Sequence, residues 1–484
     1  MHRSSVWLWA FFALTALTSS VVRASADAAV AKTTIPISPD FTNVKLLRVL
    51  DLRTNIVQED LGVRAKNIQS YPVSEYIFML PQEEEEKAAS VSAFLRQEPK
   101  TSLSITQVGF DSEKQVQLYK ITFDEPVQPG QEIRFGVKIA YTHALEPLPA
   151  RIPQVARQFV LYNGNVYSYS AYPSDEIKTT VQLPTKMIQS FTGGDFVQQS
   201  GNKIIYGPFE NAGPELFAPL RLHYEYSKPL LTVTELRRDL QVSHWGNNLA
   251  VEEDYKLYHA GAQLEEEFSR ITYQMTRMVH SQTNVLKDLT FRLPAGARDV
   301  YYRDEIGNVS TSHFRPDKDA AIFQFAPRYP LFGGWNYTWY HGYNVDLNKF
   351  VRYSKETGQY MLNVNFVDNV YDMAVDKLRL NIVLPEGATN VKVHAPFKLD
   401  REEHATHFTN FDSTGRYLLI LEKHNVVKEH EQPIQITYEY PSYRLLQKPL
   451  VVSGCLFTLF MISTILSKIS FTIGTPKKPA LKKE

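Results

Sequence analysis

The sequence predicts a mainly β protein with some α-helix: two tandem, antiparallel β-rich domains followed by one C-terminal transmembrane helix. Short runs of alternating apolar and polar residues recur along most of the chain, as expected for half-buried strands. A Ser-Lys-Pro break at residues 227–229 divides these runs into two units. A stretch of eighteen residues without a charge, 450–467, lies near the C-terminus and is long enough to cross a bilayer.

The N-terminus predicts a targeting segment. His2 and Arg3 precede an apolar run over residues 6–17, and small residues follow up to Ala26. This order is typical of a secretory signal peptide over residues 1–26, cleaved between Ala26 and Asp27. A signal anchor that stays in the membrane is the alternative. With the signal removed, the bulk of the protein would lie in the lumen or outside the cell.

Composition limits the classes of function. The chain holds 52 basic and 52 acidic residues, which gives no broad field for nucleic acid or for an acidic partner. The single cysteine, Cys455, lies inside the apolar stretch 450–467, so residues 27–449 cannot use disulfides. A region of about 420 residues without disulfides must rest on large cores, on the scale of two to three domains. This argues against disulfide-stapled receptor or adhesion modules.

The first β-rich domain is predicted over residues 27–228. We expect its strands at 45–52, 74–80, 115–123, 133–141, 158–162, 166–170, 179–183 and 220–226. The acidic run 83–86 leads into 88–95 and is interpreted as a solvated helix start, because carboxylates suit the helix dipole. A cation site there is the less favoured alternative. The proline-rich connector 146–153 is expected to lie outside any regular element.

The second β-rich domain is predicted over residues 229–445. We expect its strands at 231–243, 289–293, 321–325, 360–367, 377–384, 417–422 and 434–440. Its clearest helix has apolar residues at spacings of four, three, four and three: Leu264, Phe268, Ile271, Met275 and Met278. Such a stripe is typical of a helix face packed on a sheet.

A short internal echo hints at duplication. Tyr224-Glu225-Tyr226 closes the first unit and Tyr438-Glu439-Tyr440 closes the second. Both units also begin with a long strand rich in Leu, Val and Arg. A duplicated β-rich module would produce this pattern.

The motifs assign no catalytic, cofactor-binding or metal-binding residue. The sequence holds no Gly-x-Ser-x-Gly, no phosphate-binding glycine loop and no His-Glu-x-x-His. His404 and His407, preceded by Glu402 and Glu403, have metal-like spacing but lack a third identifiable ligand. We therefore favour a solvated polar segment over a zinc site. The motif pattern favours a binding or scaffolding role without excluding an enzyme.

Two glycosylation sequons are present, at Asn308 and Asn336. The second lies in an aromatic block. If that block is a strand, Asn336 shares one face with Thr338, while Trp335, Tyr337 and Trp339 share the other. Packing of these rings into the core is favoured over an aromatic sugar-binding platform, and burial of Trp339 against the domain's own helix would exclude the platform.

The transmembrane helix is predicted over residues 446–474, with a cytosolic tail at 475–484. Four lysines in the tail outnumber the two basic residues on the other side, which places the tail in the cytosol and the bulk in the lumen. Four residues, Gly454, Thr458, Met461 and Ile465, share one helical face. The first two form a small-xxx-small pair that permits close approach of another helix.

Several long stretches resemble a known family. They are Leu148-Pro149-Ala150-Arg151-Ile152-Pro153-Gln154 with residues 158–165, and the segments 298–310 and 327–335. The chain is similar in these to ribophorin I, the alpha subunit of the endoplasmic reticulum oligosaccharyltransferase, over nearly the whole luminal region and the membrane span.

The resemblance implies a non-catalytic subunit that helps transfer a dolichyl-diphosphate-linked oligosaccharide to Asn in Asn-x-Ser/Thr of nascent chains. It implies a single-pass type I protein of the endoplasmic reticulum membrane. The implied partners are a multi-spanning catalytic subunit, other small membrane subunits and nascent polypeptides, with no cofactor of its own. Animal members continue into a long cytosolic domain, whereas this sequence ends 16 residues after Lys468, like the short-tailed fungal form. The alternatives are a freestanding luminal lectin or cargo-binding type I membrane protein, and a membrane-anchored hydrolase.

Overall fold

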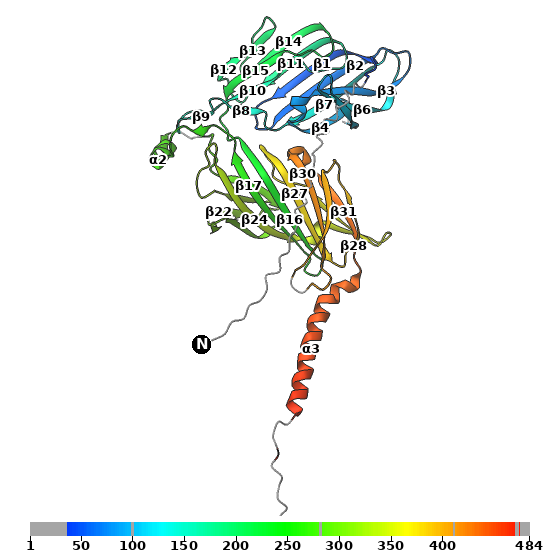
Figure 1. Ribbon diagram of the computed structural model, residues 1–484, viewed down its shortest axis with the longest axis vertical. Coiled ribbons are helices and arrows are strands. Elements are labelled where there is room, and N and C mark those ends of the chain that lie inside the picture. The colour runs from blue at the N-terminus through cyan, green and yellow to red at the C-terminus, as the bar shows by residue number, and fades with distance from the viewer. Residues whose placement is uncertain (1–35, 98–100, 280–282, 410–411, 470–473, 475–484) are drawn as a thin grey trace, which may run out of the picture.

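The computed structural model describes residues 36–97, 101–279, 283–409, 412–469 and 474. It consists of two β units, one above the other, and a C-terminal helix that projects from the second unit (Figure 1). The mainly β fold class and the single apolar C-terminal helix are confirmed. The domain boundaries at 228 and 445 remain predictions about units that fold independently.

The first unit contains two sheets around one core. The ten-stranded sheet runs, in spatial order, β13 (Val197–Ser200), β14 (Lys203–Ala212), β11 (Ser174–Gln182), β1 (Phe41–Asp51), β2 (Val57–Asn67), β7 (Glu132–Tyr141), β4 (Ala88–Leu95), β5 (Ser102–Asp111), β6 (Val116–Val127) and β3 (Val73–Pro81). The four-stranded sheet runs β12 (Ile188–Phe191), β15 (Pro219–Glu225), β10 (Phe159–Asn165) and β8 (Leu145–Pro147). Apolar side chains from Phe41 to Leu230 fill the core between them.

The second unit repeats this plan with an additional small sheet. Its eight-stranded sheet runs β21 (Gly307–Asn308), β20 (Arg298–Asp304), β24 (Asn336–Asp346), β17 (Asn248–His259), β16 (Leu231–Ser243), β27 (Met373–Glu386), β30 (Arg416–Val426) and β29 (Arg401–His407). Opposite lie β25 (Val351–Ser354), β26 (Gln359–Asn365), β31 (Pro433–Glu439) and β28 (Thr389–His394), and separately β19 (Leu289–Pro294), β23 (Ala320–Phe325) and β22 (Ser312–Arg315). Its core draws on residues from Leu231 to Tyr438.

Short elements complete the chain. The helices are α1 (Gln82–Glu85), α2 (Arg270–Val279) and α3 (Gln447–Lys468), with 3-10 turns η1 (Leu347–Lys349), η2 (Lys428–His430) and η3 (Ser442–Leu446). A two-stranded parallel pair, β9 (Arg151–Ile152) and β18 (Gln263–Leu264), links the two units.

The topology supports the duplication suggested by the sequence echo. The order β13-β14-β11-β1-β2-β7-β4 of the first unit matches β29-β30-β27-β16-β17-β24-β20 of the second, with the same strand directions. In each unit one pair in this otherwise antiparallel order is parallel, β1 with β11 and β16 with β27. The small sheets match as β12-β15-β10-β8 and β28-β31-β26-β25. The Tyr-Glu-Tyr repeats lie at the ends of the matching strands β15 and β31.

The duplication extends to single residues. Gly136 of β7 pairs with Phe94 of β4, and an added Cβ at Gly136 would meet the Phe94 ring at 2.5 Å. At the matching place, Gly342 of β24 pairs with Tyr301 of β20, whose ring covers it in the same way. An aromatic side chain laid across a strand glycine restores the contact area that the glycine lacks. Both units use this arrangement at the same point of the sheet.

The two units are joined by specific contacts. The Asn55 amide donates to the Leu231 carbonyl at 2.7 Å, and Asp372 accepts from the Asn55 backbone and from Lys228. A small apolar cluster with Ile56 and Val427 lies beside these bonds. The junction is therefore both polar and apolar.

Three expectations about local structure were wrong. Residues 88–95 form strand β4, because they pair with β7 and β5, and only one helical turn, α1, precedes them. Residues 166–170 are irregular because side chains bind their carbonyls: Thr179 bonds to Val166 at 2.7 Å and Arg48 to Tyr167 at 3.3 Å. The connector 146–153 contributes to β8 and β9 rather than lying wholly outside regular structure.

The predicted helix stripe also differs from the structure. Helix α2 begins only at Arg270, because the Ser269 hydroxyl caps it by accepting a bond from the Thr272 backbone at 3.2 Å. Its apolar side chains do not pack on a sheet: Ile271 and Met275 are 67 and 66% exposed, and α2 projects from the body (Figure 1). Leu264 belongs to β18, and the Met278 side chain lies outside the described residues.

Candidate functional site beside the C-terminal helix

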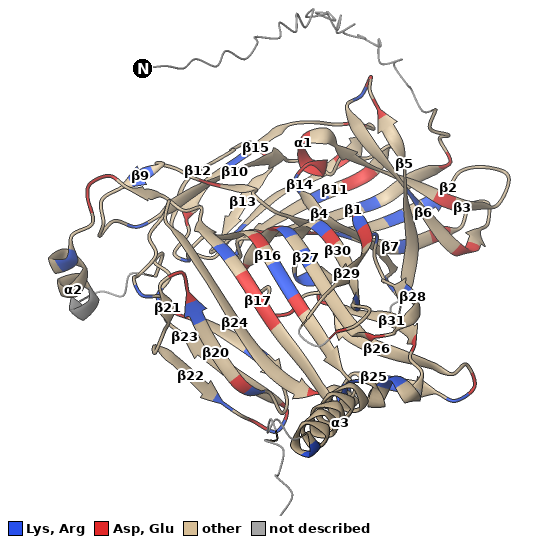
Figure 2. Ribbon diagram, turned by 60° about the horizontal axis from the view of Figure 1, so that its bottom comes forward, with Lys and Arg blue, Asp and Glu red and all other residues tan. Residues whose placement is uncertain are grey.

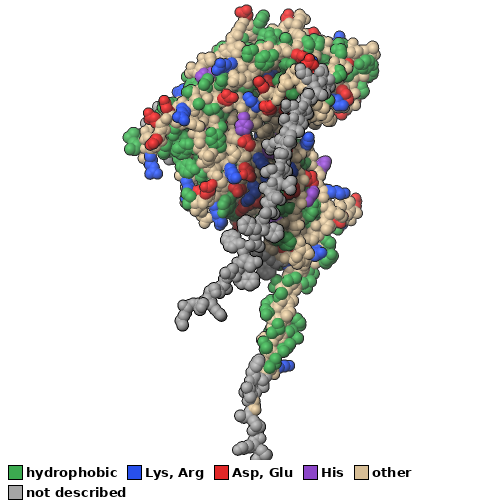
Figure 3. All heavy atoms as spheres, in the orientation of Figure 1, with side chains coloured by type: hydrophobic (Ala, Val, Ile, Leu, Met, Phe, Trp, Pro, Cys, Tyr) green, Lys and Arg blue, Asp and Glu red, His purple; other side chains and the backbone are tan. Residues whose placement is uncertain are grey.

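The C-terminal helix is the one candidate membrane span among the described residues. The span covers Tyr443–Lys468, 26 residues, and contains an 18-residue window with a mean hydropathy of 2.1, none of which is buried against the rest of the chain. In Figure 3 its apolar side chains stand clear of both β units. Exposed apolar surface of this length is typical of a helix surrounded by lipid. Residues 470–473 and 475–484 of the predicted span and tail lie outside the described residues.

Polar contacts fix the start of α3 to the second unit. Lys448 donates to the Asp412 carboxylate at 2.5 Å, and the Gln447 side chain donates to the Ser413 hydroxyl at 2.7 Å. Arg416 lies on the other side of Asp412 at 3.2 Å. Burial tends to raise the pKa of Asp412, but hydrogen bonds from Lys448 and Thr409 outweigh it and lower the pKa below its usual value. Asp412 is therefore ionised at neutral pH, and the helix is tied to the β unit by charge.

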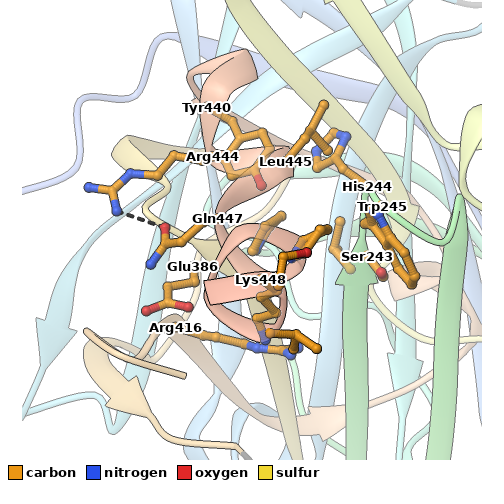
Figure 4. Close-up of a pocket in the computed structure, with 15 residues that line it drawn as sticks. Ser243, His244, Trp245, Glu386, Arg416, Tyr440, Arg444, Leu445, Gln447 and Lys448 are labelled. Atoms are coloured by element: carbon orange, nitrogen blue, oxygen red, sulfur yellow. Dashed lines mark hydrogen bonds between the residues drawn. The ribbon is translucent and has the colours of Figure 1, made fainter. Parts of the chain in front are cut away.

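A cavity of about 570 Å³ lies at this junction. Its walls come from the β16–β17 turn, the end of β27, the start of β30, and η3 with the first turns of α3. Figure 4 shows Glu386, Gln447 and Arg444 on one side, Ser243, His244 and Trp245 on the other, and Lys448 between them. The remaining lining residues are mostly apolar: Val242, Pro385, Leu445, Pro449, Val452, and also Tyr440, Arg416 and Ser453. A volume of this size is typical of ligand-binding cavities.

Two exposed aromatic side chains lie near the cavity and the start of α3. Trp245, in the turn between β16 and β17, is 76% exposed, and Tyr443 of η3 is also exposed. His244, also in the cavity wall, shares a hydrogen bond with the Tyr438 hydroxyl at 2.7 Å and stacks on Tyr440. Burial lowers the pKa of His244 to about 4, so this ring is neutral at pH 7. Exposed Trp and Tyr next to a membrane span are typical of residues at the bilayer surface.

Glu386 is the unusual group of the cavity. Its Oε1 accepts four hydrogen bonds, from the backbone and hydroxyl groups of Ser413 and Thr414 at 2.6–2.9 Å. Its Oε2 is buried and has no hydrogen-bond partner among the described residues. Burial tends to raise the pKa of Glu386, and these bonds outweigh it and lower the pKa, so the carboxylate is charged. A buried, charged oxygen without a donor is costly and calls for a partner.

The two predicted sequons lie on one face of the large sheet of the second unit. Asn336 is exposed at the start of β24, and Asn308 is exposed on β21. Arg303 of β20 connects the two strands: its Nε donates to the Asn308 side chain at 2.7 Å, and its Nη1 lies 3.5 Å from the Tyr340 hydroxyl. Figure 2 marks acidic and basic positions along β16 and β17 of the same sheet. Occupancy of both sequons remains a prediction.

The aromatic block of β24 packs into the core, as the sequence favoured. Trp339 is 1% exposed and stacks on Tyr255 with ring centroids 4.7 Å apart, and Tyr337 is buried beside it. The sugar-binding platform is therefore excluded, although the rings that bury Trp339 come from strands and not from a helix. Only Trp335 of the three stays partly exposed, where it packs on Phe268.

The other candidate groups are placed separately. His404 and His407 lie three residues apart on β29 and so face opposite sides of the sheet, and His404 bonds to the Tyr417 hydroxyl at 2.6 Å. Among the described residues no group of three or more His, Cys, Asp or Glu is placed to hold a metal ion. Gly454, Thr458, Met461 and Ile465 are exposed along α3, as a packing face requires. Ala26 and Asp27 lie outside the described residues.

Sequence reasoning missed the cavity. Its residues come from four segments that are far apart in the chain, so no local pattern joins them. One signal was present: Trp245 is a large apolar residue in a short polar turn, Ser243-His244-Trp245-Gly246-Asn247-Asn248, where small polar residues are expected.

Comparison with known proteins places the chain in a family. The family model described as ribophorin I matches residues 41–467. A Caenorhabditis elegans protein, dolichyl-diphosphooligosaccharide–protein glycosyltransferase subunit 1, is 37% identical over 437 residues, covering 90% of this chain and 73% of the relative. Subunit 1B of Oryza sativa subsp. japonica is 37% identical over 74% of this chain and 75% of its own. Subunit 1B of Arabidopsis thaliana is 33% identical over 90 and 94%.

Similarity to solved structures is weaker. Native yeast LTA4 hydrolase overlaps 42% of this chain and 33% of its own at 9% identity, with a TM-score of 0.25. An overlap of this quality does not specify a fold. The family match spans both β units and nearly all of α3, and these three relatives are 33–37% identical to this sequence over the aligned residues. The chain therefore belongs to the ribophorin I family.

Proposed function

We propose that this chain is a non-catalytic subunit of a dolichyl-diphosphooligosaccharide–protein glycosyltransferase, the oligosaccharyltransferase of the endoplasmic reticulum. The observation that carries the proposal is the family match over residues 41–467, together with relatives whose names describe subunit 1 of that enzyme. In this role the chain supports transfer of the lipid-linked oligosaccharide to Asn in Asn-x-Ser/Thr of nascent proteins.

The distribution of ionisable groups supports a scaffolding role. Burial tends to lower the pKa values of Arg48 and Arg238, but neighbouring carboxylates outweigh it and raise them. Burial raises the pKa of Glu253 and lowers that of His341. All four side chains are almost fully buried within a β unit. Arg48 and Arg238 each contact a buried glutamate and so act inside the fold. Shifted groups often mark active sites, but buried ion pairs that no substrate can reach are structural. The chemistry then belongs to a separate multi-spanning catalytic subunit.

The proposed arrangement is a type I protein with both β units in the lumen and the short tail in the cytosol. The β units offer acceptor polypeptides a large surface beside the catalytic subunit, and α3 contacts other membrane subunits through Gly454, Thr458, Met461 and Ile465. A close helix contact at Gly454 is sterically open, since an added Cβ there would meet nothing within 4 Å.

Purification in mild detergent tests the proposal. The full chain is expected to co-elute with a multi-spanning transferase, and recovery as a lone monomer would contradict subunit membership. Depletion of the chain is expected to leave reporter sequons under-occupied. Full occupancy after depletion would contradict a role in transfer. The alternative of a freestanding lectin loses its sharpest support, because Trp339 and Tyr337 are buried.

A further inference from the structure

The cavity beside α3 lies where the polar start of the helix gives way to its uncharged stretch. Lys448 lies at the start of the helix, and Val452, also in the cavity wall, lies about 6 Å further along the axis. The uncharged stretch begins at residue 450. One end of the cavity is therefore polar and the other faces the apolar part of the span, which suits an amphipathic ligand that already lies in the membrane.

The polar end has a small positive excess. Arg416, Arg444 and Lys448 are the cations at the cavity, and Asp412 and Glu386 are the carboxylates. His244 is neutral because it is buried. Three positive and two negative groups leave a net charge of about +1, which favours an anionic group such as a phosphate.

Glu386 adds a second requirement. The residue is 6% exposed, and its Oε2 has no donor among the described residues, although Oε1 is saturated by the loop at Ser413 and Thr414. A ligand that neutralises this oxygen must bring an N–H or O–H group, and a primary ammonium brings three N–H donors and a positive charge. A quaternary ammonium brings the charge without a donor.

The apolar end is built for hydrocarbon. Val242, Pro449 and Val452 line it, and Trp245 stands at the rim. Because Val452 belongs to the exposed face of the candidate span, an acyl chain in the cavity would continue along α3 into the bilayer.

We propose that this cavity binds one membrane glycerophospholipid whose headgroup carries both a phosphate and a primary ammonium, as in phosphatidylethanolamine. The ammonium lies beside Glu386, where a small shift of the cavity wall lets it donate to the buried Oε2. The phosphate lies toward Arg416, Arg444 and Lys448, and one acyl chain follows Val452. The lipid fills the joint between the β unit and the span and so fixes their relative orientation. This inference goes beyond the proposed function and does not depend on which complex the chain joins.

The test uses the full chain, purified with its partners in mild detergent and then delipidated. Phosphatidylethanolamine, its N-methyl and N,N-dimethyl derivatives and phosphatidylcholine, with identical acyl chains, are added back one at a time. Native mass spectrometry measures the fraction carrying one lipid. We expect phosphatidylethanolamine to bind about tenfold or more tightly than phosphatidylcholine, because only the quaternary headgroup lacks a donor for Glu386. Equal binding would overturn the proposal, because it would show that Glu386 does not contact the headgroup.

Two variants locate the site. Glu386→Gln keeps an acceptor for Ser413 and Thr414 but removes the charge, so phosphatidylethanolamine should bind no more tightly than phosphatidylcholine. Val452→Trp fills the cavity from an exposed helix face and should reduce binding of every lipid, and it remains informative if Glu386→Gln does not fold. Phe457→Trp, about 140° around α3 from position 452, is the matched control and should bind normally. An unchanged preference in Glu386→Gln would overturn the headgroup assignment.

A photo-crosslinking side chain at position 452 distinguishes lipid from a partner helix. In the intact complex we expect the crosslink to form to phospholipid. A crosslink to another protein subunit would show that a helix occupies the cavity and would overturn the proposal.

Discussion

Arg48 and Arg238 occupy the same position in the two β units. Arg48 donates from Nη1 to the carbonyl of Asn165, the last residue of β10, at 2.5 Å. Arg238 donates from Nη1 to the carbonyl of Asn365, the last residue of the matching strand β26, at 2.6 Å. Arg48 lies on β1 and Arg238 on β16, each of which belongs to the parallel pair of its large sheet, and both side chains reach the small sheet. Each therefore ties the two sheets of its unit together.

The arginine of the first unit also forms a buried ion pair. Arg48 Nε lies 2.7 Å from Glu59, and both side chains are almost fully buried. Arg48→Met should lower the free energy of unfolding by about 3–5 kcal/mol, because it leaves a buried carboxylate without its partner. Replacing both residues, in Arg48→Met/Glu59→Leu, should recover much of this loss. Denaturant unfolding of the purified chain in detergent measures both, and a double variant less stable than the single one would contradict the account.

Stability should fall as the pH drops below about 6.5. Burial lowers the pKa of His259 and His430 to about 4 and, together with Arg238, that of His341 to about 3. The unfolded chain binds protons at these sites below about 6.5, whereas the folded chain does so only near these lower values. The stabilisation is thus complete above about pH 6.5 and is lost toward pH 4. Thermal unfolding midpoints between pH 7 and 5 should show the decline.

Glu84 provides a second test of this pH dependence. Burial raises the pKa of this carboxyl to about 7, so Glu84 contributes in the opposite direction, and Glu84→Gln should steepen the decline. His341→Phe should make it shallower. The lowered pKa of Asp412 changes the free energy of unfolding only below about pH 4, so it does not affect the comparison between pH 7 and 5. A midpoint that does not change from pH 7 to 5 in the Glu84→Gln background would contradict the histidine account.

The packing face of α3 can be tested at Gly454. Leucine fits there in the isolated chain, so Gly454→Leu should leave both β units folded and yet release partner subunits in mild detergent. The Thr458 hydroxyl already donates to the Gly454 carbonyl at 2.8 Å, so close packing at this face must come from small size more than from interhelical hydrogen bonds. Ser463→Leu, about 180° around the helix, is the control and should keep the complex intact. Co-purification of all subunits with Gly454→Leu would return α3 to a plain anchor.

Both sequons should carry glycans in cells. Asn308→Gln and Asn336→Gln should each remove one glycan, seen as a mobility shift that endoglycosidase treatment abolishes, and the double variant should show no shift. Because the two side chains share one sheet face, glycans there would shield β20, β21 and β24 from protein partners. Conversely, close crosslinks from this face to another subunit in the glycosylated complex would contradict that shielding.

Much of the fold could be predicted because burial alternates along single strands. Strand β16 has the bounds expected from its apolar pattern, and the alternation in β24 correctly placed Tyr337 and Trp339 in the core. Strand β17 was missed because Glu252, Glu253 and Asp254 follow one another in it, which hides the apolar face. Glu253 is buried there only because Arg238 on the neighbouring strand neutralises it. Such a pairing depends on register, which one segment of sequence does not contain.

The cavity could not be predicted for a related reason. Glu386 looks like an ordinary surface acid until Ser413 and Thr414 fold over it, and Lys448 looks like a flanking lysine until Asp412 binds it. These relations join β27, the start of β30 and α3. They exist only in the folded chain.

Because the β unit is duplicated, one substitution can be made at matching positions of both units and the two effects compared. Gly136→Ala and Gly342→Ala introduce the same methyl group under Phe94 and Tyr301, at equivalent points of two equivalent sheets. One copy belongs to the unit that bears the span and the other to the unit stacked on it (Figure 1). A difference between the two variants therefore combines two effects: the ring that covers each glycine, and the position of the unit along the molecule. The chain therefore allows the same Gly→Ala substitution to be compared in a unit that adjoins the candidate span and in a unit that does not.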